Sequence, residues 1–224
     1  MESSIFRGHK VPEAKGLCVV IDVLRAFTTA AFAFASGAKE IIFVASPEEA
    51  FMKYQQDPSL LLMGEREGKR IEGFHFENSP SEIQCADLSG RTMVQRTSSG
   101  TQGVVSCSHA PHILIASFVV ADATVKRILE LKPSHVSFVA TGRTNGDEDV
   151  ALAEYLQSKL KGKPIDLDHA LCRVRTSPAA ERMKKGPIAY KNGGHDLELA
   201  LKVDHFSFAM EVFKINGELI GRAI

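Results

Sequence analysis

The chain has 224 residues, of which 44% are hydrophobic and 24% are charged, a composition typical of a globular protein with a proper core. Its 27 Lys and Arg residues balance its 27 Asp and Glu residues, so there is no basic excess with which to bind nucleic acid or an anionic membrane. The longest apolar stretch, 26–38, is too short and too interrupted to span a bilayer. Because the first residues also lack the apolar core of a signal peptide, we expect a cytoplasmic protein.

Apolar runs alternate with helical patterns up to about residue 160. The runs are short and rich in Val, Ile and Leu, which is typical of buried strands. Strands are predicted at 17–21, 40–45, 60–63, 92–97, 112–116 and 135–140, and helices at about 27–36, from 47, after 100, at 121–131 and at 147–160. This alternation indicates an α/β fold with a largely parallel sheet that is covered on both faces.

The last third of the chain has a weaker pattern. Residues 163–186 are charged and helical in part, and residues 192–194 are predicted to form a loop. The apolar run 206–215 fits a helix or a strand equally well. The four cysteines are scattered without a C-x-x-C pair, which argues against a zinc site and against a disulfide framework.

We expect these elements to form one domain over residues 1–224, because no low-complexity linker divides the chain. The runs 17–37 and 92–108 each show a strand, a polar turn and a helix. This shared pattern suggests an internal duplication within the domain.

Ligands of such folds bind beyond the carboxyl ends of the strands, and polar residues of this chain gather there. Asp22 and Arg25 follow the first strand, where an acid and a base can hold a cation and an anion side by side. The same two side chains can also form an ion pair without a functional role. Phosphatases of the haloacid-dehalogenase type are disfavoured, because they need a second acid at the position of Leu24.

The segment 64–80, GEREGKRIEGFHFENSP, combines glycines, acids, arginines and an Asn-Ser-Pro turn directly after a strand. A packed core has no use for this mixture. An anion site with a metal ion does, because it needs carboxylates for the cation, guanidinium groups for oxyanions and glycines for close backbone approach. Glu65 and Arg66 are therefore candidate functional groups, and Asn78 and Ser79 are candidate hydrogen-bond donors to a substrate.

Two further polar segments follow later strands. The run Thr97-Ser98-Ser99-Gly100-Thr101 precedes a predicted helix and can cradle a phosphate or sulfonate, or merely cap the helix. Three acids at 147–149 begin another helix. There they can complement the helix dipole, but adjacent carboxylates are also the ligands that Mg²⁺ prefers. Spacing alone does not decide between these roles.

Taken together, these segments resemble the 2-phosphosulfolactate phosphatase family. The resemblance rests on Asp22-Val23-Leu24-Arg25-Ala26, GEREGKRIEGF at 64–74, Asn78-Ser79-Pro80, Thr97-Ser98-Ser99-Gly100-Thr101 and Glu148-Asp149, which occur in family order over most of the chain. It implies a three-layer α/β/α fold. It also implies a Mg²⁺-dependent phosphomonoesterase that converts 2-phospho-3-sulfolactate to 3-sulfolactate and phosphate, on the route to coenzyme M.

The chain departs from the family pattern at four positions. His75 stands where the family commonly has an acid, and Arg96 replaces a Thr. Ser99 replaces one Asn, and Val120 stands where another Asn is common. We expect these departures to alter contacts with the substrate or the metal ion.

The resemblance leads to a hypothesis of metal-assisted hydrolysis by direct attack of water. Asp22, Glu65 and one of Glu148 or Asp149 would hold Mg²⁺, which would orient the water for in-line attack. Arg25 and Arg66 would bind the anionic groups of the substrate. The remaining candidate substrate contacts are Asn78, Ser79, Thr97, Ser98, Ser99, Gly100 and Thr101.

Two alternatives stay open at the level of sequence. The chain could be a non-catalytic binding protein for a small anion on the same scaffold, or a phosphatase for a different short-chain phosphoester. A phosphoenzyme formed on Asp22 would replace direct attack by water. A homodimer is the default expectation for the assembly.

Overall fold

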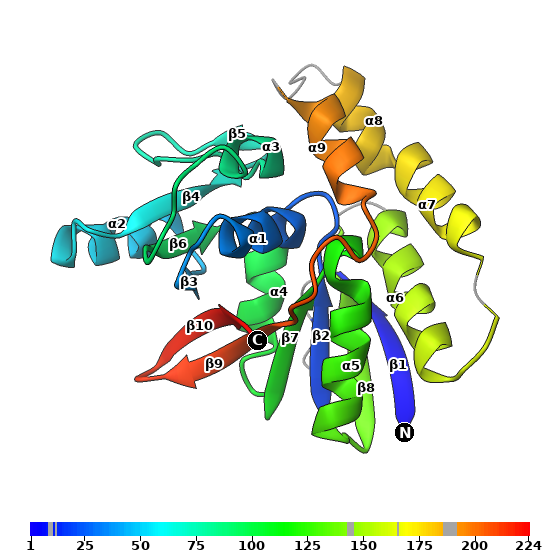
Figure 1. Ribbon diagram of the computed structural model, residues 1–224. Coiled ribbons are helices and arrows are strands. Elements are labelled where there is room, and N and C mark those ends of the chain that lie inside the picture. Colours follow the sequence, from blue (N-terminus) through cyan, green and yellow to red (C-terminus); the bar gives the residue numbers. More distant parts are fainter. Residues whose placement is uncertain (9–10, 12, 143–145, 165, 186–191) are drawn as a thin grey trace.

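The computed structural model describes the chain except for residues 9–10, 12, 143–145, 165 and 186–191 (Figure 1). Its described part contains a ten-stranded sheet with the order β1-β8-β2-β7-β9-β10-β3-β6-β4-β5. The strands are β1 (Glu2–Arg7), β2 (Leu17–Ile21), β3 (Glu40–Phe43), β4 (Leu61–Arg66), β5 (Lys69–Arg70), β6 (Thr92–Arg96), β7 (His112–Ala116), β8 (His135–Ala140), β9 (Met210–Ile215) and β10 (Glu218–Ala223). The predicted α/β fold with a mixed, mostly parallel sheet is confirmed.

The sheet consists of two parallel halves joined by an antiparallel hairpin. Strands β1, β8, β2 and β7 are parallel neighbours in one half, and β3, β6 and β4 are parallel neighbours in the other. The hairpin β9–β10 lies between them and pairs antiparallel with β7 on one side and β3 on the other. The second half therefore runs opposite to the first, which the alternation of strands and helices does not reveal.

The carboxyl ends of the two halves nevertheless meet. In Figure 1, β2 and β8 run nearly vertically whereas β4 runs across the picture, because neighbouring strands of a twisted sheet are rotated by about 20–25°. Gly100 follows β6, and a Cβ added to it would lie 2.8 Å from Oδ2 of Asp22, which follows β2. The twist thus brings the polar segments of both halves to one place.

Helices cover both faces of the sheet. They are α1 (Ala26–Ala35), α2 (Pro47–Gln56), α3 (Pro80–Ile83), α4 (Gly100–Ser106), the 3₁₀ helix η1 (Phe118–Val120), α5 (Ala121–Leu131), α6 (Asp147–Leu160), α7 (Leu167–Thr176), α8 (Pro178–Lys185) and α9 (Gly193–Ala200). Helices α1 and α4 share one core with both halves. Helices α5, α6 and α7 pack on the other face of the β2 half, and α2 packs on the other face of the β3 half. This is the predicted three-layer arrangement.

Strand β2 and helix α1 show how the sequence specifies this core. Cys18 and Val20 belong to the core that contains α1, whereas the alternate residues of β2 belong to the opposite core, as the period of a strand requires. All residues of α1 from Ala26 to Phe34 are buried, because the helix packs against β7, α3, α4 and η1. A helix that is apolar all round is buried all round.

Several predicted bounds are confirmed, and some are wrong. The strands at 112–116 and 135–140 and the helix at 121–131 have the predicted bounds. The strand expected at 60–63 continues to Arg66, and the loop expected at 192–194 is the start of α9. The open choice at 206–215 is resolved as a strand from Met210. Strands β1, β5 and β10 were not predicted.

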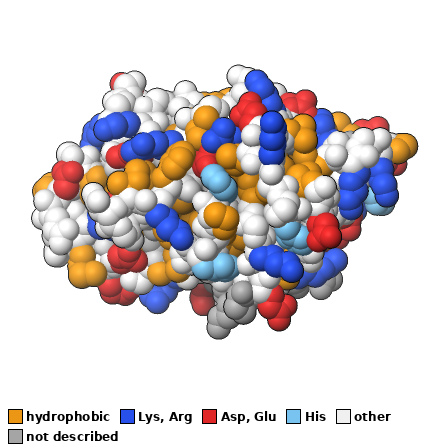
Figure 2. All heavy atoms as spheres, turned by 90° about the horizontal axis from the view of Figure 1, so that it is seen from below, with side chains coloured by type: hydrophobic (Ala, Val, Ile, Leu, Met, Phe, Trp, Pro, Cys, Tyr) orange, Lys and Arg blue, Asp and Glu red, His pale blue; other side chains and the backbone are white. Residues whose placement is uncertain are grey.

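The surface and the helices give two further observations. Figure 2 shows a face on which basic and acidic side chains are interspersed with apolar ones, in keeping with the balanced charge of the chain. Within the described residues, the helices lack the length and apolarity that a membrane crossing requires. The expected single domain, the internal duplication and the homodimer stay predictions.

Candidate active site

Four carboxylates gather where the two halves of the sheet meet. Asp22 follows β2, Glu65 lies near the end of β4, and Glu148 and Asp149 lie in the first turn of α6. All four are at most 8% exposed. Burial raises the pKa of Asp22 to about 7, and the negative charges of Glu65 and Glu148 add to the rise. The structure therefore brings the four predicted metal ligands into one electrostatically coupled cluster.

Asp22 lies at the centre of this cluster. Its Oδ1 accepts a hydrogen bond of 3.0 Å from the backbone N–H of Ala26 at the start of α1. A backbone hydrogen bond from Gly100 also lowers its pKa, against the larger effect of burial. The hydroxyl of Thr141 lies 3.5 Å from Oδ2. The turn between β2 and α1, which contains a cis peptide bond at Leu24-Arg25, thus aims the carboxylate at the adjoining loops after β6 and β8.

Asp149 ties two of the strand-end loops together. Its Oδ1 accepts a hydrogen bond of 2.8 Å from the N–H of Val23, and its Oδ2 accepts one of 2.9 Å from the N–H of Gly142. Burial raises its pKa well above the ordinary value, and the charges of Glu148 and Asp22 contribute to the rise. Since each oxygen already accepts one backbone N–H, Asp149 fixes the positions of the loops after β2 and β8.

Glu148 is the member of the cluster that faces α7 and α8. Burial raises its pKa, whereas the positive charge of Arg182 and a hydrogen bond from Ser177 oppose the rise. Ser177 lies between α7 and α8, and Arg182 lies on α8. The C-terminal helices therefore contribute to one side of the site.

Glu65 organises the second half of the site. Its Oε1 accepts a hydrogen bond of 2.6 Å from the N–H of Ser98, and its Oε2 accepts hydrogen bonds from the N–H of Gly68 and the hydroxyl of Ser98. It thereby connects the β4–β5 turn to the loop after β6. The segment 64–70 is a β-hairpin, and Glu65 and Arg66 lie on its first strand, whereas the sequence suggested a loop there.

Most polar groups of the predicted phosphate-binding run, residues 97–101, already form hydrogen bonds within the protein. The hydroxyl of Thr97 accepts a hydrogen bond of 3.1 Å from the N–H of Thr101, and the hydroxyl of Thr101 accepts one of 2.9 Å from the N–H of Thr97. The Gly100 amide interacts with Asp22. Ser99 is the N-cap residue of α4, but its side chain makes no capping hydrogen bond and is half-buried. The hydroxyl of Ser99 is therefore the member of the run best placed to meet a ligand.

Glycines at two positions of α4 allow the halves of the site to approach. A Cβ on Gly100 would lie 2.6 Å from Cβ of Ala26, and a Cβ on Gly103 would lie 2.6 Å from Cγ2 of Thr141. The two glycines are three positions apart and so share one face of the helix. This face packs against the loops that follow β2 and β8.

We therefore expect Gly100→Ala to lower the stability by about 1–3 kcal/mol, the usual cost of an overpacked core, and to lower activity as well, because α4 must move away from Asp22. Urea unfolding and phosphate release measure the two effects. Gly194→Ala is the matched control, because a Cβ at that position of α9 meets no atom within 4 Å. It should raise stability by up to about 1 kcal/mol. Equal effects of the two substitutions would contradict the close approach.

Arg25 has partners that the sequence did not predict. Its Nη1 donates a hydrogen bond of 2.7 Å to Oδ2 of Asp196, and its Nη2 donates one of 3.0 Å to Oε1 of Glu77. The side chain is nearly buried. Its guanidinium group thus holds two internal carboxylates, and in this conformation it is not presented to a substrate as the sequence suggested.

Asp196 is the partner of Arg25 that the sequence did not predict. It is fully buried on α9, and besides Arg25 it binds the hydroxyls of Ser79 and Ser81 and the N–H of Ser81. The network fastens α9 to α1 and α3. The available signal was an acid that follows two glycines, but the sequence does not show that this acid lies on a helix and faces Arg25.

The remaining candidate substrate contacts lie on or near strands β4 and β6. Arg66 is exposed at the end of β4. The Oδ1 of buried Asn78 lies 3.4 Å from Nε2 of Gln95, and Ser79 caps α3. Arg96 donates a hydrogen bond of 2.9 Å to the carbonyl of Glu65. These positions surround the carboxylate cluster from the β4 and β6 side.

The two other departures from the family pattern lie elsewhere in the fold. His75 accepts a hydrogen bond of 3.0 Å from the N–H of Leu62 and packs edge-on against Tyr54 of α2. Val120 is buried in the core that contains α1. Both side chains have local packing roles, so neither enters the carboxylate cluster.

The donor set of the cluster suits a hard divalent cation. It supplies four buried carboxylates, the pKa of three of them is raised, and oxygen ligands are what Mg²⁺ prefers. Among the described residues, however, no group of three or more His, Cys, Asp or Glu side chains is arranged to hold a metal ion. The cluster thus supplies suitable oxygen donors but not a ready-made coordination site.

In the metal-free protein we expect stability to fall as the pH rises. Burial raises the pKa of Asp22 from 3.8 to about 7, so between these values the folded state binds more protons than the unfolded state. The corresponding stability is fully present below pH 3.8, is lost as the pH rises through about 7, and amounts to at most about 4 kcal/mol. Urea unfolding in EDTA across this range measures it. Asp22→Asn should flatten the profile, and an unchanged slope would assign the effect to other groups.

The fold and the site together define an α/β protein that carries its functional groups beyond the carboxyl ends of its strands. The chain also matches the family described as 2-phosphosulpholactate phosphatase over residues 5–212. The protein therefore belongs to the 2-phosphosulpholactate phosphatase family. The resemblance inferred from the motifs is confirmed.

Curated relatives agree with this assignment. A Bacillus subtilis protein named "Probable 2-phosphosulfolactate phosphatase" is 32% identical over 193 residues, which cover 85% of this chain and 81% of the relative. A protein of the same name from Clostridium acetobutylicum is 30% identical over 90% of this chain and 91% of its own length. A third, from Clostridium perfringens strain SM101, is 38% identical over 67% of this chain, and the match spans 64% of that relative.

Proposed function

We propose that the protein is a Mg²⁺-dependent 2-phosphosulfolactate phosphatase that hydrolyses 2-phospho-3-sulfolactate to 3-sulfolactate and phosphate. The observation that carries the proposal is the cluster of Asp22, Glu65, Glu148 and Asp149, which is buried and located where the halves of the sheet meet. Family membership and the names of the relatives support the choice of substrate.

The carboxylates would hold the metal ion. The candidates are Asp22, Glu148, Asp149 and Glu65; of these, Asp22, Asp149 and Glu65 also accept hydrogen bonds from backbone N–H groups of the surrounding loops. When bound, Mg²⁺ would neutralise phosphate charge and activate water for in-line attack. Asp149 and Glu65 would keep the loops that frame the substrate in position, and this preorganisation lowers the cost of reaching the transition state.

Arginines at the rim would bind the anionic groups of the substrate. Backbone hydrogen bonding lowers the pKa of Glu48, and the charges of Arg66 and Arg96 add to the effect, so both guanidinium groups lie near the start of α2. Arg66 is exposed at the end of β4, next to the strand position of Glu65. A guanidinium group binds phosphate or sulfonate oxygens in a forked geometry. We assign this role to Arg66 in preference to Arg25, whose guanidinium group binds Asp196 and Glu77.

The decisive experiment measures phosphate release from 2-phospho-3-sulfolactate and from a panel of short-chain phosphoesters. We expect release with Mg²⁺, none with EDTA, and a preference for the sulfonated substrate. Glu65→Gln should lower the rate, because it removes a charge from the cluster and weakens the hydrogen bond to the Ser98 N–H.

Two outcomes would favour the alternatives. Release from other esters but not from the sulfonated one would identify a phosphatase with a different substrate. Thermal stabilisation by sulfolactate or phosphate without any turnover would identify a binding protein. The binding alternative is tested because Arg25 and the Gly100 amide, two groups expected to contact the substrate, form hydrogen bonds with Asp196 and Asp22 instead.

A further inference from the structure

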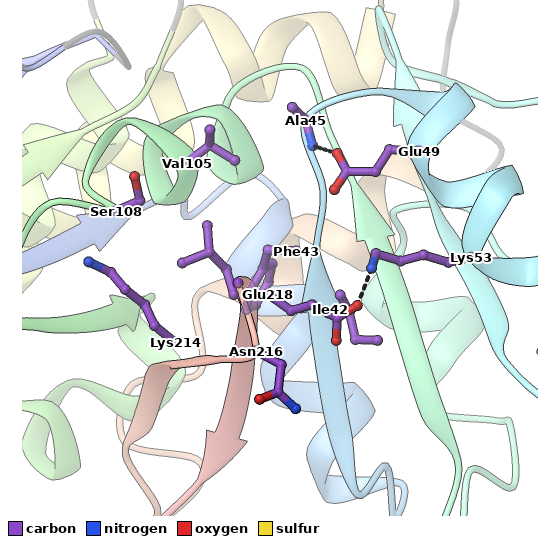
Figure 3. Close-up of a pocket in the computed structure, with 12 residues that line it drawn as sticks. Ile42, Phe43, Ala45, Glu49, Lys53, Val105, Ser108, Lys214, Asn216 and Glu218 are labelled. Atoms are coloured by element: carbon purple, nitrogen blue, oxygen red, sulfur yellow. Dashed lines mark hydrogen bonds and ion pairs between the residues drawn. The ribbon is translucent and has the colours of Figure 1, made fainter. Parts of the chain in front are cut away.

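A pocket of about 510 Å³ lies apart from the carboxylate cluster, between the β9–β10 hairpin, α2 and α4 (Figure 3). Its volume is in the range of small-molecule sites. Neither the four carboxylates nor the arginines of the candidate active site line it. The pocket is therefore a separate candidate site for a ligand.

The pocket has an apolar floor. Phe43 of β3, Val105 of α4 and Leu219 of β10 form the apolar lining on the α4 side of the sheet, and Ile42 lines the pocket on the α2 side. Figure 3 labels Ile42, Phe43 and Val105 among the side chains that line the pocket. Such a surface contributes roughly 25 cal/mol for each Å² of apolar ligand that it removes from water. An occupant is thus expected to have an apolar body.

Charged residues also line the pocket. On the α2 side, Lys53 forms an ion pair with Glu218, and Glu49 accepts a hydrogen bond of 3.0 Å from the N–H of Ala45. On the α4 side, Lys214 lies below Ser108 (Figure 3). Among the described residues, Lys214 has no hydrogen bond or ion pair to its side chain. It is the cation of the lining that is available to a ligand.

We propose that this pocket binds a small monoanionic ligand with an apolar body, of the class of medium-chain carboxylates. The carboxylate pairs with the ammonium group of Lys214 and reaches the hydroxyl of Ser108, and the chain lies on Phe43 and Val105. A dianionic phosphate ester fits less well, because Lys214 offers it a single ammonium group and Glu49 places a negative charge in the same lining.

Titration of the intact protein with octanoate, followed by calorimetry, tests the proposal. We expect saturable binding with a Kd of about 1 mM or tighter. Octyl phosphate at pH 8 and octan-1-ol should both bind more weakly than octanoate. Lys214→Gln should weaken octanoate binding about twofold to fivefold, the usual worth of an exposed ion pair, and should leave octanol binding unchanged.

Two variants act as controls. Lys202→Gln removes an exposed lysine outside the pocket and should leave the octanoate affinity unchanged. Val105→Phe fills the pocket and should abolish binding, and circular dichroism verifies that this variant is folded. Octanoate binding that survives both Lys214→Gln and Val105→Phe would overturn the proposal, and so would the lack of saturable binding at millimolar octanoate.

Discussion

Asp22→Asn is expected to lower phosphate release by about a hundredfold to a thousandfold, the range seen when a preorganised electrostatic group is lost. The amide keeps the size of the side chain and can still accept the hydrogen bond from the Ala26 N–H. It removes the charge that the proposed Mg²⁺ site needs. The measurements are the rate of phosphate release and the Mg²⁺ affinity determined by calorimetry.

The matched control for this substitution is Asp147→Asn. Asp147 also lies in the first turn of α6, but its carboxylate binds Arg173 of α7, and this ion pair lowers its pKa. We expect this variant to keep nearly full activity and the original Mg²⁺ affinity. An Asp22→Asn enzyme with near-normal turnover would contradict the proposed metal site, and a phosphoenzyme trapped on Asp22 would replace direct attack by water.

Asp196→Ala is expected to lower the free energy of unfolding by about 3–5 kcal/mol. The substitution leaves the guanidinium group of Arg25 buried with its ion pair to Glu77, and it leaves the hydroxyls of Ser79 and Ser81 without their shared acceptor. Removal of one partner from a buried pair is costly because the other charge stays desolvated. Urea unfolding at neutral pH measures the loss.

Two comparisons test the cause of this loss. Glu77→Gln removes the other carboxylate of the network, which is 20% exposed, and should cost about 1 kcal/mol, since solvent screens that pair. The double variant Arg25→Met, Asp196→Leu should recover much of the stability, because it removes both buried charges. A cost for Asp196→Ala no larger than that for Glu77→Gln would contradict the buried network.

The sequence predicted those elements whose signals are local. Strand β7, strand β8 and helix α5 agree with their predicted bounds because each is a periodic segment of ordinary length. Strand β1 was not predicted, because it is an edge strand with a half-exposed pattern and two serines. The β9–β10 turn does carry a strong local signal, the dipeptide Asn216-Gly217. Both residues have positive φ values, 52° and 83°, as a two-residue hairpin turn requires.

The candidate site could be predicted in part for the same reason. The rule that ligands bind at the carboxyl ends of strands located Asp22, Glu65 and Asp149. The role of Arg25 could not be predicted, because its partner Asp196 lies 171 positions away on a helix that the sequence did not reveal. The opposite direction of the two half sheets was hidden too, since strand order is decided by packing of the whole domain.

The central position of the β9–β10 hairpin has a consequence for how the protein folds. Residues 210–223 join the two halves of the sheet, yet they are synthesised after every other strand. Contacts so distant in sequence make folding slow, and the nascent chain must wait for this segment before its halves can close around α1. The site should therefore become able to bind its ligand only late in folding, in a single step. A ribosome-bound chain stalled before residue 210 provides a direct comparison.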